Sequence, residues 1–210
     1  MTSASAREQL REMLRRFSVR HGDFVLASGQ RSNVYVDAKL TTCKAAAMPL
    51  VGKLFLAKMK QRGWEPAAVG GLTLGADPIV LAIARQSLET GRPVDCFLVR
   101  KEPKKHGTLK FLEGLEVRER LDVVIIDDVC TTGESTVKAI DHSRASGLNV
   151  LGAVCLVDRE MGAREAVEQR GCPFDRVFTL QDLLDESEPA AGSSLARYRT
   201  MLVTWMVASL

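Results

Sequence analysis

Two adjacent carboxylates follow a run of β-branched apolar residues in the middle of the chain. Residues 123–126 read Val-Val-Ile-Ile and run directly into Asp127 and Asp128. Such a run is typical of a strand buried in a parallel sheet, and ligands of open α/β sheets collect at the carboxyl ends of strands. Because burying two carboxylates without partners is costly, we expect a ligand to meet both acids where the strand ends.

A short loop rich in hydroxyl groups continues the same stretch before a helical pattern begins. After Val129 and Cys130 it contains Thr131, Thr132, Gly133, Glu134 and Ser135. Consecutive backbone N–H groups at a helix N-terminus bind phosphate, and glycine allows close backbone approach. An ordinary turn with a Ser or Thr cap is the alternative. The preceding acids favour a phosphorylated sugar, whose ribose hydroxyls and cationic transition state they would face.

The densest group of basic residues follows another predicted strand, at 96–99. This run, residues 100–110, includes Arg100, Lys101, Lys104, Lys105 and His106. A highly anionic leaving group needs cations, and histidine can donate a proton near neutral pH. Gly107 and Gly114 would serve as hinges of a lid over the site. The alternative is a solvated basic surface loop.

Alternating strand and helix patterns must position these groups. Apolar spacing predicts helices over 10–17 and 50–59, and a hairpin from strands 24–26 and 34–36 with turns at 22–23 and 28–30. Asp77-Pro78 predicts a helix start with Asp77 as N-cap. Further strands are predicted at 67–69, 96–99, 121–126, 150–157 and 176–179, and further helices at 163–169 and 195–210, with Gly147 ending the helix after Ser135. This alternation predicts an α/β fold with a mostly parallel sheet and helices on both faces.

Composition restricts the class of protein further. The chain has 210 residues, 26% of them charged, which suits one soluble domain. A net charge of +3 is too small to indicate a nucleic-acid partner. Five cysteines without a CxxC pair favour reduced cytosolic thiols over disulfides or zinc. The sequence contains neither a P-loop nor a G-x-G-x-x-G motif. It also lacks the pattern of a secretory signal and an apolar run that could span a bilayer.

Four segments resemble one known family. Residues 123–136 resemble the phosphoribosyl pyrophosphate signature of type I phosphoribosyltransferases. Residues 24–37, 99–107 and 158–160 are similar to the N-terminal hairpin, the mobile catalytic loop and a later segment of the orotate phosphoribosyltransferase family. The resemblance implies a type I phosphoribosyltransferase-like single domain over 1–210, with a small hood around the N-terminal hairpin at about 1–45. It also implies transfer of a phosphoribosyl group to orotate, a step of pyrimidine biosynthesis.

The resemblance also implies roles for individual residues. Residues 127–135 would hold the ribose and its 5-phosphate, and the basic residues Arg100, Lys101, Lys104, Lys105 and His106 would contact pyrophosphate. Lys104, His106 and Asp128 are the implied catalytic residues. Thr131 and Arg159 would bind orotate, with Tyr35 and Val36 along the base. Without the resemblance, each of three residues has another interpretation. Arg159 could pair with Asp158 or Glu160 at the surface. Tyr35 could be a packing residue, and Cys130 a small buried residue.

Family members use Mg²⁺, which would bind through substrate oxygens and water, so no protein metal site is expected. The mobile loop reaches into the neighbouring subunit's site in this family, which implies a homodimer; a cytoplasmic location, no membrane and no nucleic acid are also expected. Two positions depart from the family, which often has lysine at Ala27 and Tyr-Lys at Thr73-Leu74. The alternatives are a phosphoribosyltransferase for a purine or other base and a non-catalytic regulatory homologue.

Overall fold

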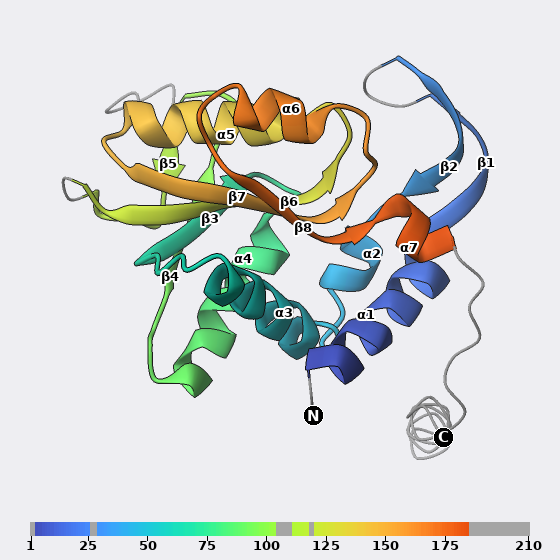
Figure 1. Ribbon diagram of the computed structural model, residues 1–210, viewed down its shortest axis with the longest axis horizontal. Helices are drawn as coiled ribbons and strands as arrows, with labels where there is room; N and C mark the ends of the chain where they lie inside the picture. Colours follow the sequence, from blue (N-terminus) through green and yellow to red (C-terminus); the bar gives the residue numbers. More distant parts are fainter. Residues whose placement is uncertain (1–2, 26–28, 104–110, 118–119, 185–210) are drawn as a thin grey trace.

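The computed structural model describes residues 3–25, 29–103, 111–117 and 120–184. In these ranges the chain forms a two-stranded hairpin and a six-stranded sheet of order β5-β4-β3-β6-β7-β8 (Figure 1). The strands are β1 (Val19–Val25), β2 (Arg31–Val36), β3 (Ala68–Leu72), β4 (Asp95–Val99), β5 (Leu112–Glu113), β6 (Asp122–Cys130), β7 (Asn149–Asp158) and β8 (Phe174–Thr179). The helices are α1 (Ser3–Phe17), α2 (Lys39–Thr42), α3 (Met48–Gln61), α4 (Asp77–Ser87), α5 (Glu134–Ala145), α6 (Ala163–Glu168) and α7 (Leu180–Leu184), with a 3₁₀ turn η1 (Leu88–Thr90).

The larger sheet is parallel except at one edge. Strands β4, β3, β6, β7 and β8 pair in parallel, and only β5 pairs antiparallel, with β4. This arrangement confirms the mostly parallel sheet predicted from the alternation of strands and helices. The short β5 strand was not predicted, because two residues are too few to carry a recognisable period.

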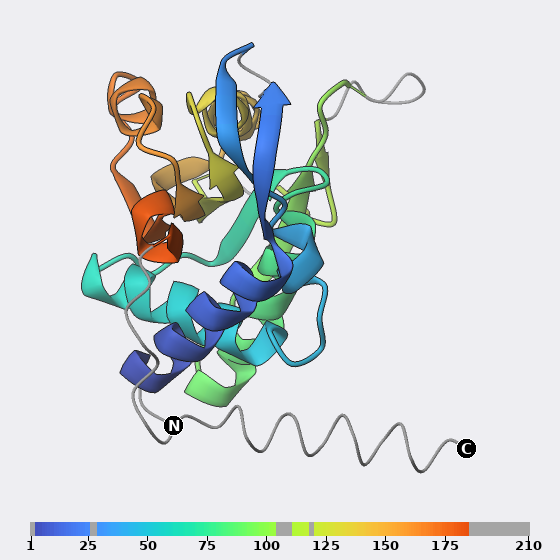
Figure 2. The same cartoon turned by 90° about the vertical axis from the view of Figure 1, so that its right-hand side faces the viewer.

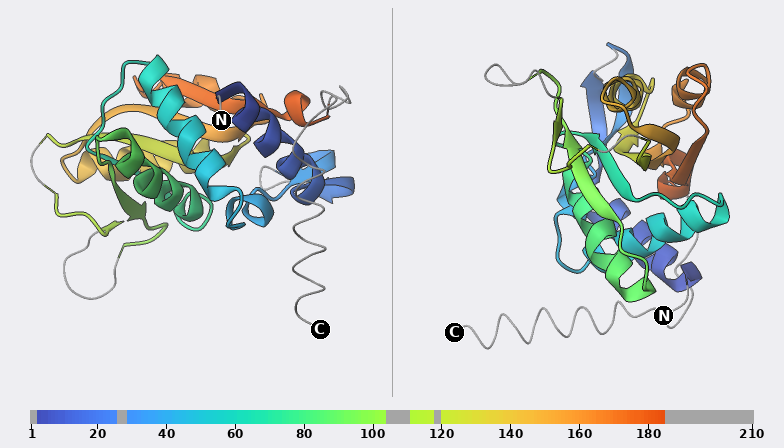
Figure 3. Two further views of the ribbon diagram at one scale, coloured as in Figure 1. Left: turned by 90° about the horizontal axis from the view of Figure 1, so that it is seen from below. Right: turned by 90° about the vertical axis from the view of Figure 1, so that its left-hand side faces the viewer.

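Helices cover both faces of this sheet, which explains the unbroken apolar run in β6. Successive strand residues point to opposite faces, so Ile126 joins a core with α1, α3 and α4, whereas Ile125 joins a second core with α5 and α6. Figure 1 shows α5 and α6 on one side of the sheet and α3 and α4 on the other. The left view of Figure 3 shows the layer of α3 and α4 from below. Both faces of β6 therefore need apolar residues.

Strand β6 is longer than the predicted 121–126. Pairing with β7 continues through Asp127, which lies opposite Cys155, to Cys130, which lies opposite Asp158. The acid pair therefore lies within the last part of the strand and not beyond its end.

The N-terminal region divides into two parts. The predicted hairpin is confirmed as β1 and β2, which extend away from the body (Figure 2). The turn predicted at Gly22-Asp23 is wrong, because both residues lie within β1, where the pairing register shifts between His21 and Phe24. Helix α1 packs on α3 and α7 and buries Ala6, Leu10 and Leu14 in the main core. Within the predicted hood region 1–45, the hairpin is thus the part that stands apart.

The predicted end of α5 can be compared with the structure, whereas several other predicted segments lie outside the described residues. Helix α5 ends at Ala145, shortly before Gly147, as the sequence predicted. The predicted helix at 195–210, the position Ala27 and part of the turn at 28–30 lie outside the described residues. In the part of the chain that the structure describes, no helix has the length and apolar character to cross a membrane.

Candidate active site

The two adjacent acids of β6 face opposite sides of the sheet. Because side chains alternate along a strand, Asp127 points toward α5 and Asp128 toward the start of α4. Asp127 is 5% exposed, whereas the side chain of Asp128 is 15% exposed and lies near Lys39. The strand does not end before the acids, so its pleat turns their side chains to opposite faces. That a ligand meets both acids stays a prediction.

The carboxylate of Asp127 is held by the protein itself. Its Oδ2 accepts hydrogen bonds from Thr136 Oγ1 at 2.7 Å and from Cys130 Sγ at 3.6 Å, and its Oδ1 accepts one from the Asp128 N–H at 3.0 Å. Burial, followed by the charge of Asp128, raises the pKa of Asp127 to about 7. These bonds connect β6 to the first turn of α5, so Asp127 stabilises the turn between the two elements.

Cys130 is also an interior residue. It is 1% exposed, and its pKa is raised by a hydrogen bond with Cys155 and by burial. The thiolate is the reactive form of cysteine, so this thiol is no nucleophile, as the sequence analysis expected.

Asp128 lies in a more open, mixed-charge environment. Its Oδ2 is 3.7 Å from Lys39 Nζ, which is also 2.8 Å from Asp37 Oδ1. Burial alone would lower the pKa of Lys39, but Asp37 and Asp128 raise it overall. The loop after β3 passes close by: a Cβ added to Gly75 would lie 2.2 Å from Asp128 Oδ1. Only glycine at this position leaves space for the carboxylate.

A second carboxylate lies close to Asp128. Asp77 was predicted to be the N-cap of α4, but it is the first helical residue and Ala76 is the cap. The buried Oδ1 of Asp77 has no hydrogen-bond partner among the described residues. Burial and the charge of Asp128 raise the pKa of Asp77. The two acids therefore form a small anionic site at the start of α4.

The β6–α5 turn, residues 131–135, leaves backbone donors without acceptors. The first N–H groups of an α-helix have no intrahelical acceptor, and the N-cap of α5, Gly133, makes no side-chain cap hydrogen bond. The side chains of Thr132, Glu134 and Ser135 are exposed, and that of Thr131 is half-buried. A Ser or Thr cap, the alternative for this loop, is thus absent from the turn. The arrangement offers N–H groups, hydroxyls and the helix dipole to an anion.

Gly133 is required in this turn for two reasons. Its φ of +82° lies in the left-handed region, which side chains with a Cβ rarely adopt. A Cβ at this position would also lie 3.0 Å from the Cα and carbonyl oxygen of Ala163 at the start of α6. Close packing against α6 therefore fixes the path of the turn.

Arg159 follows β7 and is buried, with 8% of its surface exposed. Its N–H donates to the Cys130 carbonyl oxygen at 2.9 Å, and its Nη2 donates to Ser32 Oγ at 2.9 Å and to the Val34 carbonyl oxygen at 3.2 Å. Burial lowers the pKa of this guanidinium. Its side chain thus connects the end of β7 to the β1–β2 hairpin.

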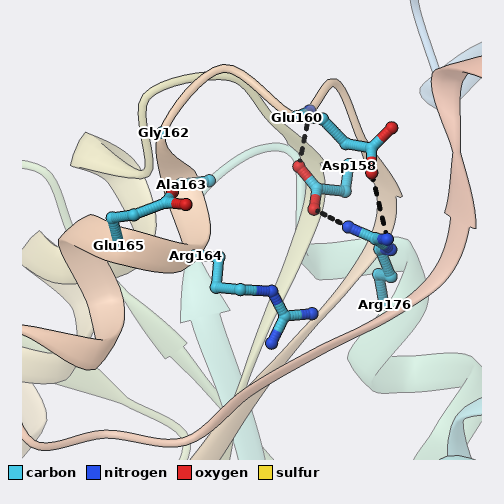
Figure 4. A pocket seen from close by; sticks show the side chains of 7 residues that line it. All are labelled: Asp158, Glu160, Gly162, Ala163, Arg164, Glu165 and Arg176. Carbon is cyan, nitrogen blue, oxygen red and sulfur yellow. Dashed lines mark hydrogen bonds and ion pairs between the residues drawn. The ribbon is translucent and has the colours of Figure 1, made fainter.

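Asp158 and Glu160 do not pair with Arg159, because both bind Arg176 of β8. Arg176 Nη1 lies 2.8 Å from Asp158 Oδ2 and its Nη2 lies 3.0 Å from Glu160 Oε1. Figure 4 shows these ion pairs beside a pocket of about 340 Å³ next to α6. The surface-arginine alternative for Arg159 is therefore wrong. The ion pairs fix the peptide that carries Arg159.

The hairpin presents only one of its two predicted base contacts toward the body. In β2 the residues Val34 and Val36 are buried, whereas Tyr35 is 40% exposed on the opposite face. The Tyr35 ring lies 5.5 Å from that of Phe24. Val36 thus shares the face of Val34, whose carbonyl oxygen binds Arg159, and Tyr35 packs on the hairpin.

The ends of the basic loop are described, but its centre is not. Lys104, Lys105 and His106 lie outside the described residues, and Lys101 is exposed. Arg100 pairs with Glu113 at 3.2 Å. Its N–H donates to the Phe111 carbonyl oxygen at 2.8 Å, which joins the two ends of the loop.

Sequence reasoning missed four residues at this site: Thr136, Lys39, Asp77 as an anionic group, and Ser32. Thr136 lies nine positions after Asp127 and Ser32 lies 127 positions before Arg159. No motif or period signals the contacts of Lys39, Asp77 or Ser32. Thr136, inside the signature segment, was the one that the sequence could have indicated.

Comparison with known proteins yields close relatives. No family model matches the sequence. The chain is 39% identical over 180 residues to an orotate phosphoribosyltransferase of Nostoc sp., covering 86% of each chain. It is 43% identical over 182 residues to one of Aquifex aeolicus, covering 85% of this chain and 97% of that relative. The crystal structure of the Mycobacterium tuberculosis orotate phosphoribosyltransferase with 5-phospho-alpha-D-ribosyl 1-diphosphate has a TM-score of 0.72 and 37% identity, and covers 86% of this chain and 99% of that chain.

The layered α/β fold and the solved structures that it resembles define the chain as a type I phosphoribosyltransferase. The resemblance found in the sequence is confirmed at this level, and the chain is a transferase. With 39–43% identity over most of its length to the two bacterial relatives, it belongs to the orotate phosphoribosyltransferase family.

Proposed function

We propose that the protein transfers the phosphoribosyl group of 5-phospho-alpha-D-ribose 1-diphosphate to orotate, which gives orotidine 5′-phosphate and pyrophosphate in pyrimidine biosynthesis. The relatives carry the activity in their names, and the M. tuberculosis structure contains the phosphoribosyl donor. The observation that supports it best within this chain is the β6–α5 turn, where an uncapped helix N-terminus lies next to the acidic end of β6.

In this proposal the sugar lies between the turn and Asp128. The N–H groups and hydroxyls of residues 131–135 bind the 5-phosphate, since a helix N-terminus favours a dianion. Asp128 faces the ribose and places negative charge near the cationic sugar of the transition state. Asp127 supports the site without contacting the sugar, because its hydrogen bonds with Thr136 and the Asp128 N–H hold the turn in place.

Cations at the other end of the sugar stabilise the leaving pyrophosphate. We assign this role to Arg100, Lys101, Lys104, Lys105 and His106, with Lys104 and His106 closest to the chemistry. Charge that develops on the leaving oxygens is stabilised best by fixed donors. Arg100 would exchange its partner Glu113 for pyrophosphate.

The base lies against Arg159, which suits the carboxylate of orotate because a guanidinium donates two parallel hydrogen bonds. Val36 and Thr131 would line the ring, and Tyr35 would contribute through the hairpin. A purine has no carboxylate for Arg159, so this residue favours orotate over the purine alternative.

Mg²⁺ would bind mainly through substrate oxygens and water, with the carboxylates of Asp128 and Asp77 as its nearest protein groups. Asp128 is partly exposed, and Asp77 Oδ1 has no hydrogen-bond partner among the described residues. Mg²⁺ binds proteins through one or two carboxylates together with phosphate oxygens and water. No cluster of three or more metal-binding side chains occurs in the described ranges. When bound, the ion would neutralise charge on the pyrophosphate.

We further propose a homodimer in which the mobile loop is shared between subunits, as the family resemblance implies. The cysteines are all free thiols, which suits the reducing cytoplasm. Gel filtration with light scattering would test the dimer, and a monomer under assay conditions would contradict it.

A base-panel assay tests the activity. Purified protein is incubated with Mg²⁺, the phosphoribosyl donor and one base, either orotate, hypoxanthine, xanthine or adenine, and pyrophosphate release is measured. We expect release with orotate alone. Turnover with a purine and none with orotate would contradict the proposal, and no turnover with any base would favour a non-catalytic homologue.

A further inference from the structure

A hydroxyl on the hairpin holds the one buried arginine of the proposed base subsite. Ser32 Oγ accepts a hydrogen bond from Arg159 Nη2 at 2.9 Å, and the Val34 carbonyl oxygen accepts a second at 3.2 Å. Both acceptors belong to β2, a strand of the separate two-stranded hairpin, whereas Arg159 follows β7. The guanidinium is therefore oriented by an element other than its own.

The hydrogen bonds of Ser32 use the full capacity of its hydroxyl group. A hydroxyl has one donor and two acceptor positions. Arg159 Nη2 and the Val34 N–H, at 3.1 Å, can only donate to Ser32 Oγ. The hydroxyl hydrogen must then point to the Val34 carbonyl oxygen at 2.8 Å. Ser32 thus has a single hydrogen-bonding arrangement, and it fixes one edge of the guanidinium.

The remaining donors of Arg159 have no acceptor in the described part of the chain. Its buried Nε has no hydrogen-bond partner there, and the contacts with β2 use only Nη2. The nearest acids in sequence, Asp158 and Glu160, are both bound to Arg176. A buried cation without an anion is costly, so the arrangement is suited to an incoming carboxylate.

We propose that Ser32 is a positioning residue for the base subsite: it orients Arg159 so that the free donors of the guanidinium meet the carboxylate of the pyrimidine. This inference rests on the proposed function and deepens it. It also makes the hairpin part of base selection, because the acceptors that orient Arg159 belong to β2.

The inference is tested by steady-state kinetics of the full chain. Ser32→Ala removes the acceptor for Arg159 and for the Val34 N–H, and loss of a hydrogen bond to a charged group corresponds to about tenfold or more in affinity. We expect the KM for orotate to rise about tenfold and the KM for the phosphoribosyl donor to change less than about twofold. Ser32→Thr keeps the hydroxyl and should restore most of the orotate affinity.

A matched control separates positioning from damage to the hairpin. Asn33 is the next residue of β2, is exposed and faces the other side of the strand. Asn33→Ala should leave both KM values within about twofold of the wild type. Circular dichroism melting of all variants checks that the fold is retained.

A double-mutant cycle tests whether Ser32 acts through Arg159. In an Arg159→Ala background, Ser32→Ala should raise the orotate KM no further. An equal rise in both backgrounds would overturn the inference, as would an unchanged orotate KM in Ser32→Ala or equal changes for both substrates. If the wild-type protein does not turn over orotate, the proposed function fails and this inference fails with it. Normal turnover with an unaffected Ser32→Ala variant refutes the inference alone.

Discussion

The two ends of the candidate site are built in different ways. The β6–α5 turn comes from one continuous stretch, and buried residues on both sides of β6 support it. The base subsite joins Arg159 to Ser32 and Val34 across 125 to 127 positions by two hydrogen bonds. Apolar packing around β6 and the hydrogen bonds of Asp127 therefore hold the phosphate end, whereas two hydrogen bonds to the hairpin orient the side chain at the base end.

This difference predicts which properties change with each substitution. Changes at the buried position of the turn, Gly133, should alter stability and the binding of the phosphoribosyl donor together, because this position packs against the start of α6. Changes at Arg159 or Ser32 should alter base binding with little loss of stability. Variants at the two ends should therefore differ in which property they change.

Asp128→Asn tests the open acid at the end of β6. The substitution keeps the size of the side chain and removes its charge, so a developing cation on the sugar loses its nearest stabilising group. Loss of one such electrostatic contact typically costs about 10²–10³ in kcat. We expect a fall of this size with both substrates saturating. Asp141→Asn, at an exposed ion pair on α5, is the control and should keep wild-type turnover; a similar kcat in both variants would remove Asp128 from the chemistry.

Asp127 predicts a pH effect on stability. Its pKa is about 7 in the folded protein, raised by burial and by Asp128 from an ordinary value of 3.8. Between about pH 4 and 7 the folded state holds a proton that the unfolded chain has lost, so stability falls as the pH rises through this window. The fall should be at most about 4 kcal/mol, since the pKa differs by about three units between the two states and one pKa unit corresponds to about 1.4 kcal/mol.

Urea unfolding at several pH values measures this effect. Asp127→Asn should flatten the profile between about pH 4 and 7, and Asp141→Asn should keep the wild-type slope. Equal slopes in the wild type and Asp127→Asn would show that Asp127 ionises normally.

Arg159→Ala tests the base end. Removal of a charge-assisted hydrogen-bond donor corresponds to about 1.5–3 kcal/mol, so the KM for orotate should rise roughly ten- to a hundredfold. The KM for the phosphoribosyl donor should stay nearly constant. Arg92→Ala removes a surface arginine that pairs with Glu65 and serves as the control. Equal weakening of both substrates would contradict the separation of the two ends.

Gly133→Ala has the smallest expected effect and a close control. Gly133 and Gly147 have φ values of +82° and +89°, but a Cβ meets Ala163 only at Gly133 and open space at Gly147. Both alanine variants carry the same left-handed strain, so their difference isolates the contact with α6. We expect Gly133→Ala to be less stable than Gly147→Ala by about 1 kcal/mol, and to bind the phosphoribosyl donor several times more weakly. Identical binding in both variants would exclude the turn from the phosphate site.

The sequence predicted the parts of this site that depend on local order. The Val-Val-Ile-Ile run located β6, because a strand covered on both faces needs apolar residues throughout. The hydroxyls and Gly133 located the turn, because few residue types suit a helix N-terminus that binds an anion. The hairpin was also predicted, although Gly22 proved to lie inside β1 at a register shift.

Other features depend on contacts that no local pattern records. Strand β6 continues through Asp127, whose buried carboxylate accepts a hydrogen bond from the Thr136 hydroxyl. The apolar pattern of 123–126 could not show this contact. The partners of Asp158 and Glu160 are on β8, and the acceptors of Arg159 are on β2. Packing of α1 on α3 and α7 likewise depends on tertiary structure. Residue types indicated the chemistry here, but the direction of each side chain came from the fold.

A crystal structure of the protein with Mg²⁺ and 5-phospho-alpha-D-ribose 1-diphosphate would show whether the β6–α5 turn binds the 5-phosphate. We expect the 5-phosphate within hydrogen-bond distance of the N–H groups of residues 132–135, with the ribose beside Asp128 and with Asp127 still bound to Thr136. A 5-phosphate bound elsewhere, with the β6–α5 turn empty, would contradict it.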